Sequence, residues 1–316
     1  MIMKKDFITI TDYTADELWQ ILHAGTSIKS KQKKGEEFTP LRGKSLGMIF
    51  HKPSARTRIS FDVGFFQLGG HPLLLTEAEI GFGKRETIED LSRLFSRYLD
   101  AVMIRTFQHQ SVLDLAQNTS IPVINGLTDF NHPCQVMADL LTLTEYRNDL
   151  KSQKIVFIGD GNNVCNSWFH AAGILGLNFT LACPTGFEIP QEVWDESQVL
   201  AQKSGAVLSI THDPQEAVQG AHVIYTDTWT SMGQEKEAEI RKKAFEGFQV
   251  NNDLMAHCAK DYLVMHCLPA HRGEEITDAV IDSSHSIVFD QAENRLHAQK
   301  AIMVKLLAPE VFKTLI

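Results

Sequence analysis

Residues 54–58, with the sequence Ser-Ala-Arg-Thr-Arg, bring two hydroxyl groups and two guanidinium groups into one short segment. The apolar run 46–50 before them predicts a buried strand, and the apolar spacing within 59–68 predicts a helix after them. Ser54, which follows Pro53, is expected to be the N-cap of that helix. A helix start presents unpaired N–H groups and the positive end of the helix dipole, and arginine matches phosphate oxygens with a planar fork. The segment therefore predicts a phosphate-binding site, the alternative being a charged first turn that faces water.

The two arginines of this segment are expected to have different roles. Arg56 and Arg58 are two residues apart and so do not share a helix face. We assign Arg56 to the site and expect Arg58 to hold the turn in shape.

Further polar groups follow the carboxyl ends of other predicted strands, where parallel α/β sheets bind their ligands. These groups are Arg105-Thr106, His132-Pro133-Cys134-Gln135, Asp160-Gly161-Asn162-Asn163, Asp227 with Ser231-Met232-Gly233, and His266-Cys267-Leu268-Pro269. Arg105, beside a hydroxyl, favours an oxyanion or phosphate ligand over a structural ion pair. His132 heads a predicted helix, where it is either a neighbour of the cap or a donor to a carbonyl oxygen, as acyl transfer requires.

The cysteines near these strand ends are not expected to act as nucleophiles. Cys134 and Cys165 are more typical of packing residues. His266 and Cys267 are adjacent on a predicted strand and so point to opposite faces, which argues against a Cys–His dyad.

The segment Gly159-Asp160-Gly161 resembles the start of a dinucleotide-binding loop. However, the third glycine position holds Val164, and Cys183-Pro184 stands where the later acidic residue belongs. An NAD-linked dehydrogenase is therefore a weak alternative.

Alternating strands and helices are expected to position these groups. The predicted strands are 46–50, 71–75, 101–105 and 122–125 in the first half, and 155–158, 178–183, 206–210, 222–227 and 263–267 in the second. The predicted helices are 59–68, 86–99, 112–117, 133–146, 166–175, 191–203 and 294–307. Gly176 is the expected stop of the helix 166–175, and the basic run 31–34 is expected to be a solvated helix end. This alternation predicts an α/β fold with two doubly wound parallel-sheet domains in tandem, linked by long helices. The polar run 147–154 is the expected domain boundary.

Composition excludes several classes of protein. The chain has 316 residues, 43% hydrophobic and 22% charged, with a net charge of −9, which disfavours nucleic acid as a partner. No apolar run is long enough to span a bilayer, and the first residues lack the apolar core of a signal peptide, so cytoplasmic residence is expected. The five cysteines are widely spaced without a Cys-x-x-Cys pair, which argues against disulfides and a zinc site.

The polar groups at 54–58, 105–106, 132–135, 227–235 and 266–269 occur in the order and approximate spacing of the transcarbamylases. The chain resembles the ornithine carbamoyltransferases over essentially its full length. The resemblance implies a carbamoyl-phosphate domain at 1–148, joined by a terminal helix at about 293–316, and an ornithine domain at 149–292. It also implies a homotrimer or a multiple of trimers, with no metal or organic cofactor.

The resemblance assigns site residues by position. Carbamoyl phosphate would be held by Ser54, Ala55, Arg56, Thr57, Arg105, His132, Gln135, Cys267, Leu268 and Arg295, and ornithine by Asn163, Asp227, Ser231 and Met232. The four catalytic candidates are Cys267, Asp227, Arg105 and His132. Cys267 and Asp227 would orient the neutral δ-amine and accept its proton, while Arg105 and His132, with Thr57, would meet the tetrahedral oxyanion.

The second half indicates which amine is the acceptor. Asp227 is a carboxylate suited to the α-ammonium of ornithine, whereas aspartate would call for arginines. Putrescine lacks the amino-acid head group, and a putrescine enzyme is the closest alternative. A non-catalytic binding protein of the same fold is a third hypothesis, disfavoured by the intact polar set.

Two positions depart from the family pattern. Ala55 replaces a common threonine and keeps only its backbone N–H. In the loop 77–85 Gly81 stands where many members have a glutamine that reaches carbamoyl phosphate in the trimer, so Lys84 or Arg85 would have to replace that contact. The family reaction serves arginine synthesis and arginine breakdown alike.

Overall fold

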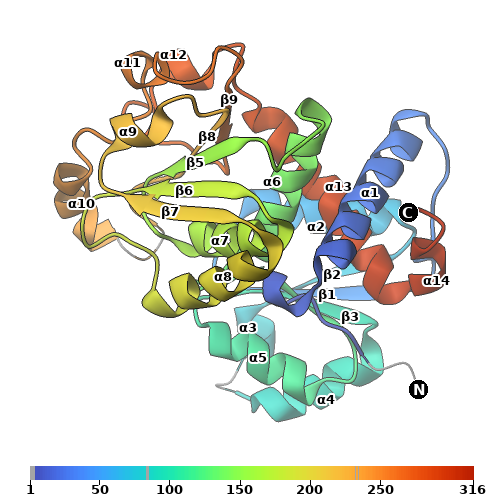
Figure 1. The fold of residues 1–316 in the computed structure, drawn as a ribbon. Coiled ribbons are helices and arrows are strands. Elements are labelled where there is room, and N and C mark those ends of the chain that lie inside the picture. The colour runs from blue at the N-terminus through green and yellow to red at the C-terminus, as the bar shows by residue number, and fades with distance from the viewer. Residues whose placement is uncertain (1–3, 83–84, 232, 234) are drawn as a thin grey trace. The chain divides into compact units, whose positions relative to one another are not determined.

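The computed structural model describes residues 4–82, 85–231, 233 and 235–316. The chain divides into two compact units, of which the first comprises Met1–Leu141 with Glu293–Ile316 and the second comprises Thr142–Ala292. Each unit contains one sheet in which every strand pair is parallel, with helices packed on it (Figure 1). The predicted α/β fold with two parallel sheets is confirmed.

The sheet of the first unit has the strand order β2-β1-β3-β4. Its strands are β1 (Ser45–Phe50), β2 (His71–Thr76), β3 (Ala101–Arg105) and β4 (Val123–Leu127). The chain moves from β1 to β2 on one side and returns to β3 on the other, so the direction of winding reverses between β1 and β3. Ligands of open α/β sheets bind at such a switch point, beyond the carboxyl ends of the strands.

Several helices belong to the first unit. They are α1 (Ala15–Lys33), α2 (Ala55–Gln67), α3 (Glu77–Ile80), α4 (Ile88–Tyr98), α5 (His109–Asn118) and α14 (Pro309–Phe312). On one face Ile49 and Ile104 of the sheet pack with Leu91 and Phe95 of α4 and with Val112 of α5. This apolar layer fixes the strand ends that carry the polar groups.

The sheet of the second unit has the order β7-β6-β5-β8-β9. Its strands are β5 (Lys154–Ile158), β6 (Asn178–Ala182), β7 (Val207–Thr211), β8 (Val223–Thr226) and β9 (Leu263–His266). The winding reverses between β5 and β8, which is the second switch point.

Both faces of the second sheet are apolar and covered. The helices of this unit are α7 (Asn163–Leu175), α8 (Gln191–Ser204), α9 (Pro214–Val218), α10 (Ala238–Ala244), α11 (Asn252–Met255) and α12 (Asp278–Ile281). Trp168 of α7 stacks on Phe179 of β6 with centroids 5.4 Å apart. A second cluster packs Ile224 and Val264 with Phe245. α7 ends at Gly176, whose φ of 73° is left-handed, as the sequence predicted.

Two long helices contribute residues to both units: α6 (Pro133–Tyr146) and α13 (Val288–Leu307). Among the helices that the structure describes, none is both long and apolar enough to cross a bilayer.

Two features differ from the sequence expectations. The apolar residues Ile59, Val63 and Phe66, whose spacing predicted α2, are 60%, 37% and 70% exposed, while the neighbouring Phe61 and Phe65 are buried. The buried side of α2 is therefore not the side that its hydrophobic spacing indicated. Helix α1 was expected only as a helix end at 31–34, although the Thr14–Glu17 capping box marks its start.

Candidate active site

The turn between β1 and α2 is built as the sequence predicted. Ser54 is the N-cap of α2, and its Oγ accepts the Thr57 N–H at 3.2 Å. The same Ser54 hydroxyl donates to Thr57 Oγ1 at 3.1 Å. Thr57 is buried, so its hydroxyl lies at the base of the helix start, where the N–H groups and the helix dipole favour an anion.

Two buried arginines from distant parts of the sequence reach the Thr57 hydroxyl. Arg105, at the end of β3, donates to Thr57 Oγ1 at 3.4 Å, and Arg295 of α13 donates to it at 3.2 Å. Arg105 is further held by the Lys52 carbonyl at 3.2 Å, and Arg295 by Gln135 Oε1 at 2.7 Å. The guanidiniums converge at the β1–β3 switch point and make a strongly cationic site.

His132 lies among these cations and is buried. Burial, followed by the positive charges of Arg295, Arg105, Arg56 and Lys52, holds the pKa of His132 well below its ordinary value. The imidazole is therefore neutral at physiological pH. A neutral ring donates a hydrogen bond without adding charge, which suits a carbonyl oxygen that becomes negative during a reaction.

The remaining members of the first set are placed on the same turn. Arg56 is half-buried and its charge acts on His132, whereas Arg58 is exposed. Ala55 is the first residue of α2. Lys52 was not among the predicted site residues; it is buried, bonds Asp129 at 2.8 Å and contributes a further cation, and its only signal in the sequence is its place just after the strand.

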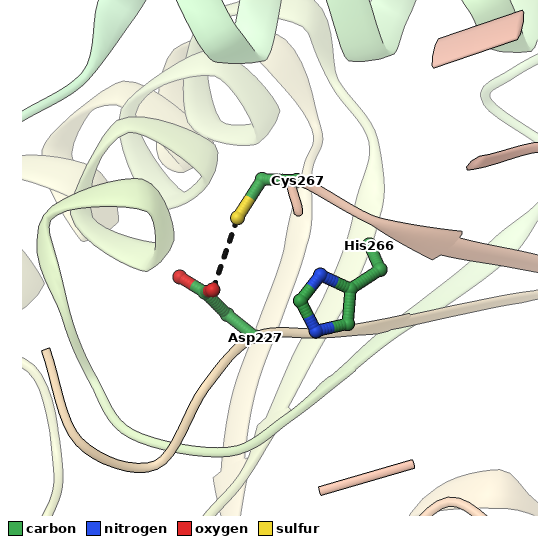
Figure 2. A group of neighbouring side chains, drawn as sticks. All are labelled: Asp227, His266 and Cys267. Atoms are coloured by element: carbon green, nitrogen blue, oxygen red, sulfur yellow. Dashed lines mark hydrogen bonds between the residues drawn. The ribbon is translucent and has the colours of Figure 1, made fainter. Parts of the chain in front are cut away.

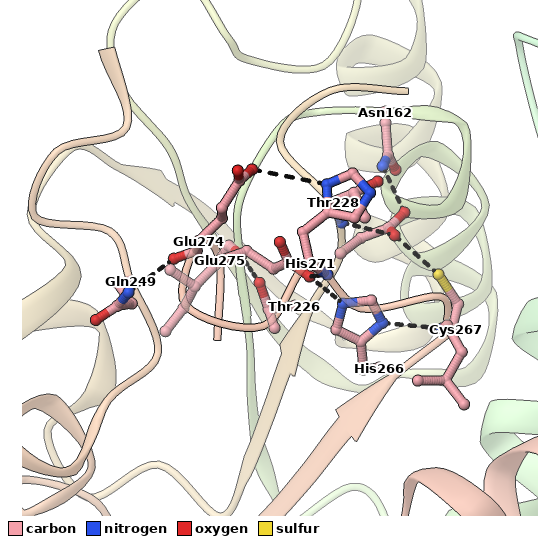
Figure 3. A network of polar contacts seen from close by, with 12 residues as sticks. Asn162, Thr226, Thr228, Gln249, His266, Cys267, His271, Glu274 and Glu275 are labelled. Atoms are coloured by element: carbon pink, nitrogen blue, oxygen red, sulfur yellow. Dashed lines mark hydrogen bonds and ion pairs between the residues drawn. The ribbon is translucent and has the colours of Figure 1, made fainter. Parts of the chain in front are cut away.

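In the second unit Asp227 and Cys267 meet at the β5–β8 switch point. The Cys267 thiol donates to Asp227 Oδ1 at 3.0 Å (Figure 2). Asp227 also accepts the Thr228 N–H at 2.8 Å and an amide hydrogen of Asn162 at 2.8 Å (Figure 3). Both carboxylate oxygens are thereby oriented.

Asn162 is a residue that the sequence prediction missed. It is the N-cap of α7, where its Oδ1 accepts the N–H groups of Val164 and Cys165 at 3.0 and 3.1 Å. The cap leaves the side-chain amide nitrogen pointing to Asp227. Its signal was the Asp-Gly-Asn-Asn turn after β5, in which only Asn163 was assigned to the site. Asn163 is the first residue of α7.

His266 supports the turn after β9. Its Nδ1 accepts the Leu268 N–H at 2.8 Å, so the proton of the neutral ring resides on Nε2, which faces Glu275 Oε1 at 2.9 Å (Figure 3). Both ring nitrogens are engaged away from the Cys267 thiol. Leu268 has a φ of 57°, a left-handed conformation unusual for a leucine, and its bond to His266 helps to hold it.

The segment after β8 is tied to the end of β5. Arg241 of α10 donates to Asp160 Oδ2 at 2.9 Å and to the Trp229 carbonyl at 3.1 Å. Burial raises the pKa of Asp160 to about 6, although the Arg241 charge opposes that shift. Ser231 follows in this segment, and Met232 lies outside the described residues.

The loop 77–85 gives Gly81 a backbone role. Its φ is 52°, its carbonyl accepts the Arg85 N–H at 2.8 Å, and a Cβ at Gly81 would come within 2.5 Å of the Arg85 Cβ. Glycine is therefore required by the conformation of the loop. The Arg85 side chain is exposed, and Lys84 lies outside the described residues.

Within the described part of the chain, two groups have metal-ligand atoms within 4.8 Å of one another: Asp227 with His266 and Cys267, and His271 with Glu274 and Glu275. In the first group Cys267 bonds Asp227 and His266 bonds Glu275, so protein partners account for the arrangement.

Comparisons with known proteins agree along the whole chain. The family model for the aspartate/ornithine carbamoyltransferase carbamoyl-phosphate binding domain matches residues 5–145, and the model for the Asp/Orn binding domain matches 151–306. An ornithine carbamoyltransferase of Anoxybacillus flavithermus is 51% identical over 96% of this chain and 96% of its own. An anabolic ornithine carbamoyltransferase of Pyrococcus furiosus is 51% identical over 95% of each chain.

Solved structures show the same relationship. The ornithine carbamoyltransferase structure from Pyrococcus furiosus has a TM-score of 0.94 at 50% identity, covering 97% of this chain and 98% of that one. The anabolic enzyme from Campylobacter jejuni has a TM-score of 0.90 at 37% identity, covering 96% and 98%. With both of its domain models matched and relatives half identical along nearly the full length, the chain belongs to the aspartate/ornithine carbamoyltransferase family of transferases.

Proposed function

We propose that this enzyme transfers the carbamoyl group of carbamoyl phosphate to the δ-amine of L-ornithine, giving L-citrulline and phosphate. The observation that carries the proposal is the convergence of Arg105 and Arg295 on Thr57 at the start of α2, beside a neutral His132. A helix N-terminus with converging guanidiniums is complementary to a phosphate, and a neutral donor is complementary to a carbonyl.

Carbamoyl phosphate is bound in this proposal by the first unit. The α2 N-terminus, with Ser54, the Ala55 N–H, Arg56 and Thr57, takes the phosphate group. Arg105 and His132 take the carbonyl oxygen, while Gln135 fixes Arg295 through the bond at 2.7 Å. Cys267 and Leu268 complete the set by analogy with the family.

Ornithine is bound by the second unit. Asp227 provides the negative charge for an ammonium group, and Asn163, Ser231 and Met232 provide the remaining contacts. The bonds from Asn162 and Thr228 hold the Asp227 carboxylate before substrate arrives, so little reorganisation is needed when the amine binds.

The chemical step is a direct attack by nitrogen on carbon. Asp227 and the Cys267 thiol orient the δ-amine, and the Asp227 carboxylate receives the proton that the amine loses. The carbonyl oxygen becomes negative in the tetrahedral intermediate, where Arg105, His132 and Thr57 stabilise it. The carbon–oxygen bond to phosphate then breaks, the phosphate oxygen takes up a proton that balances the one lost by the amine, and Arg56 with the α2 N-terminus stabilises the leaving hydrogen phosphate dianion. Positioning of two bound reactants supplies about 7–11 kcal/mol of the barrier reduction at most.

The enzyme in this proposal is a cytoplasmic homotrimer, or a multiple of trimers, that acts in arginine metabolism without a metal or organic cofactor. The exposed apolar stripe of Ile59, Val63 and Phe66 supports assembly, because contiguous apolar surface of this kind is typical of subunit interfaces.

A substrate panel tests the proposal. Purified protein is given carbamoyl phosphate and, in parallel, ornithine, putrescine, N-acetylornithine or aspartate, and the ureido product is identified by mass. We expect citrulline from ornithine. Product from putrescine but not from ornithine would replace the proposed acceptor, and no product from any amine would contradict the enzymatic assignment.

A further inference from the structure

Lys300 of α13 is a buried cation outside the candidate active site. The residue is 3% exposed. Its Nζ donates to the side-chain carbonyl oxygens of Gln32, from α1, and Gln67, from α2. Both partners are neutral, so the ammonium is hydrogen-bonded without being neutralised.

The acidic groups near this lysine are engaged with other cations. Glu36 lies 3.3 Å from Lys31, and Glu37 lies 3.1 Å from Arg42. The ring of His297 on the same helix is a further titratable neighbour, and burial, followed by the charges of Lys300 and Lys29, lowers the pKa of His297. Burial lowers the pKa of Lys300 to about 8, as expected for an ammonium without a counter-ion.

A cavity of about 250 Å³ opens beside Lys300. It is lined by Lys300, Gln32, Gln67 and Thr39 together with the apolar Ile28 and Phe38. This volume is far larger than a three-atom electrophile needs. Burial thus makes the Lys300 amine partly neutral, and the cavity gives a small reagent access to it.

We propose that Lys300 is a carbamoylation site, modified by the isocyanic acid that carbamoyl phosphate releases in water. In the release, the carbon–oxygen bond to phosphate breaks and a proton passes from the nitrogen to the phosphate, giving isocyanic acid and hydrogen phosphate. The Lys300 nitrogen then attacks the isocyanate carbon, one carbon–nitrogen bond forms, and a proton moves to the other nitrogen. Nothing is oxidised and no group leaves. Only the supply of reagent rests on the proposed function.

Two other lysines, the buried Lys29 and the half-buried Lys305, serve as internal comparisons. Lys29 lies 4.0 Å from Glu293, and Lys305 lies 3.8 Å from Glu17, so each has a carboxylate close by. For Lys300, a pKa of about 8 instead of 10.5 raises the neutral fraction at pH 7.5 roughly 200-fold. The neutral urea product retains N–H groups for the two glutamine oxygens.

The test is a pulse of ¹³C-labelled cyanate at pH 7.5, followed by peptide mass spectrometry of the native protein. We expect Lys300 to be labelled at least about tenfold faster than exposed lysines such as Lys33 and Lys34, given its larger neutral fraction. Labelling no faster than at those residues would overturn the proposal. Because cyanate is supplied directly, the result does not depend on citrulline synthesis; a second arm with ¹³C-carbamoyl phosphate tests the source.

Two variants of the exposed partner Gln67 distinguish the effect of a nearby charge on the labelling of Lys300 from the effect of a changed side-chain shape. Gln67→Glu places a carboxylate against the ammonium and should slow labelling of Lys300 about tenfold, by raising its pKa by about one unit. Gln67→Met removes the hydrogen bond without adding charge and should label at least as fast as the parent protein. Equal rates in the two variants would contradict the mechanism, and unchanged labelling of Lys305 in both confirms that the fold is retained.

Discussion

The Cys267 thiol lies 3.0 Å from Asp227 Oδ1, although 40 positions separate the two residues in the chain. The register of the sheet explains the contact. Strands β8 and β9 pair in parallel with Thr226 opposite His266, so the next residue of each strand emerges at the same edge. The relationship is thus fixed by a backbone ladder and not by loop conformation.

Removing the Asp227 charge should prevent this side chain from accepting the proton of the δ-amine, while the binding of carbamoyl phosphate by the first unit is retained. For Asp227→Asn we expect kcat to fall by about 10²–10⁴-fold, the range for loss of a positioned acid–base group. Cys267→Ser keeps a hydroxyl donor to Asp227 and should cost less. Steady-state kinetics with ornithine measure both variants, and calorimetry should show unchanged binding of carbamoyl phosphate to Asp227→Asn. An Asp227→Asn enzyme with parental kcat would remove Asp227 from the chemistry.

Asn162 is predicted to act through Asp227, beyond its role as a helix cap. Asn162→Ala should cost about 1 kcal/mol of stability for the lost cap. It should also raise KM for ornithine, because Asp227 loses an orienting bond. Asp213→Ala is the matched control, since Asp213 caps α9 of the same unit through Gln215 and Glu216. If the two variants lose stability equally and neither changes KM, Asn162 is only a cap.

The parallel sheets and the strand-end groups could be predicted from sequence because both depend on local pattern. Buried parallel strands are short apolar runs, and their carboxyl ends carry the polar residues of a ligand site. The cap at Ser54 and the stop at Gly176 depend on one or two residues, and both were predicted.

Other features depend on contacts that sequence does not display. Asn162 and Asn163 are adjacent and chemically identical, and only the cap geometry shows which one orients Asp227. The apolar spacing on α2 identified a helix, but it did not distinguish the face packed inside this chain from the exposed stripe of Ile59, Val63 and Phe66. The assignments of Ser231 and Met232 rest on family resemblance.

Substitution of Arg56 and substitution of Arg58 should have different effects on the steady-state kinetics. Arg56→Ala should raise KM for carbamoyl phosphate and lower kcat, because a charge beside His132 and the phosphate is lost. Arg56→Lys keeps the charge without the bidentate fork and should recover part of the loss. Arg58 is exposed, so Arg58→Ala should change KM for carbamoyl phosphate less than Arg56→Ala. The reverse order would exchange their roles.

Acid should destabilise the second unit through His170. This side chain is buried beside Glu196, at 3.1 Å, and burial lowers the pKa of His170 from 6.5 to about 4. The unfolded chain therefore takes up a proton at a higher pH than the folded chain does. Between pH 6.5 and 4 this should remove about 3 kcal/mol of unfolding free energy.

Urea unfolding of the parent and of His170→Gln across this pH range measures the effect. The variant should show the weaker dependence on pH, whatever its stability at pH 7. Parallel curves would indicate that His170 has an ordinary pKa.

The apolar stripe on α2 should be required for assembly. Phe66→Glu places a charge on a residue that is 70% exposed in the single chain, so the fold should persist while the oligomer dissociates. Light scattering coupled to size exclusion reports the mass, and circular dichroism reports the fold. Tyr98→Glu, at a side chain 74% exposed, is a control for charge alone. A parent protein that is monomeric would contradict the assembly proposal.

The stoichiometry of the reaction tests the central claim most directly. The enzyme is supplied with ¹³C-carbamoyl phosphate and ornithine, and labelled citrulline and free phosphate are quantified together over time. Direct transfer predicts equal amounts of both products, with formation that depends on ornithine and is abolished in Asp227→Asn. Phosphate release without labelled citrulline, or citrulline formation unaffected by Asp227→Asn, would contradict the account.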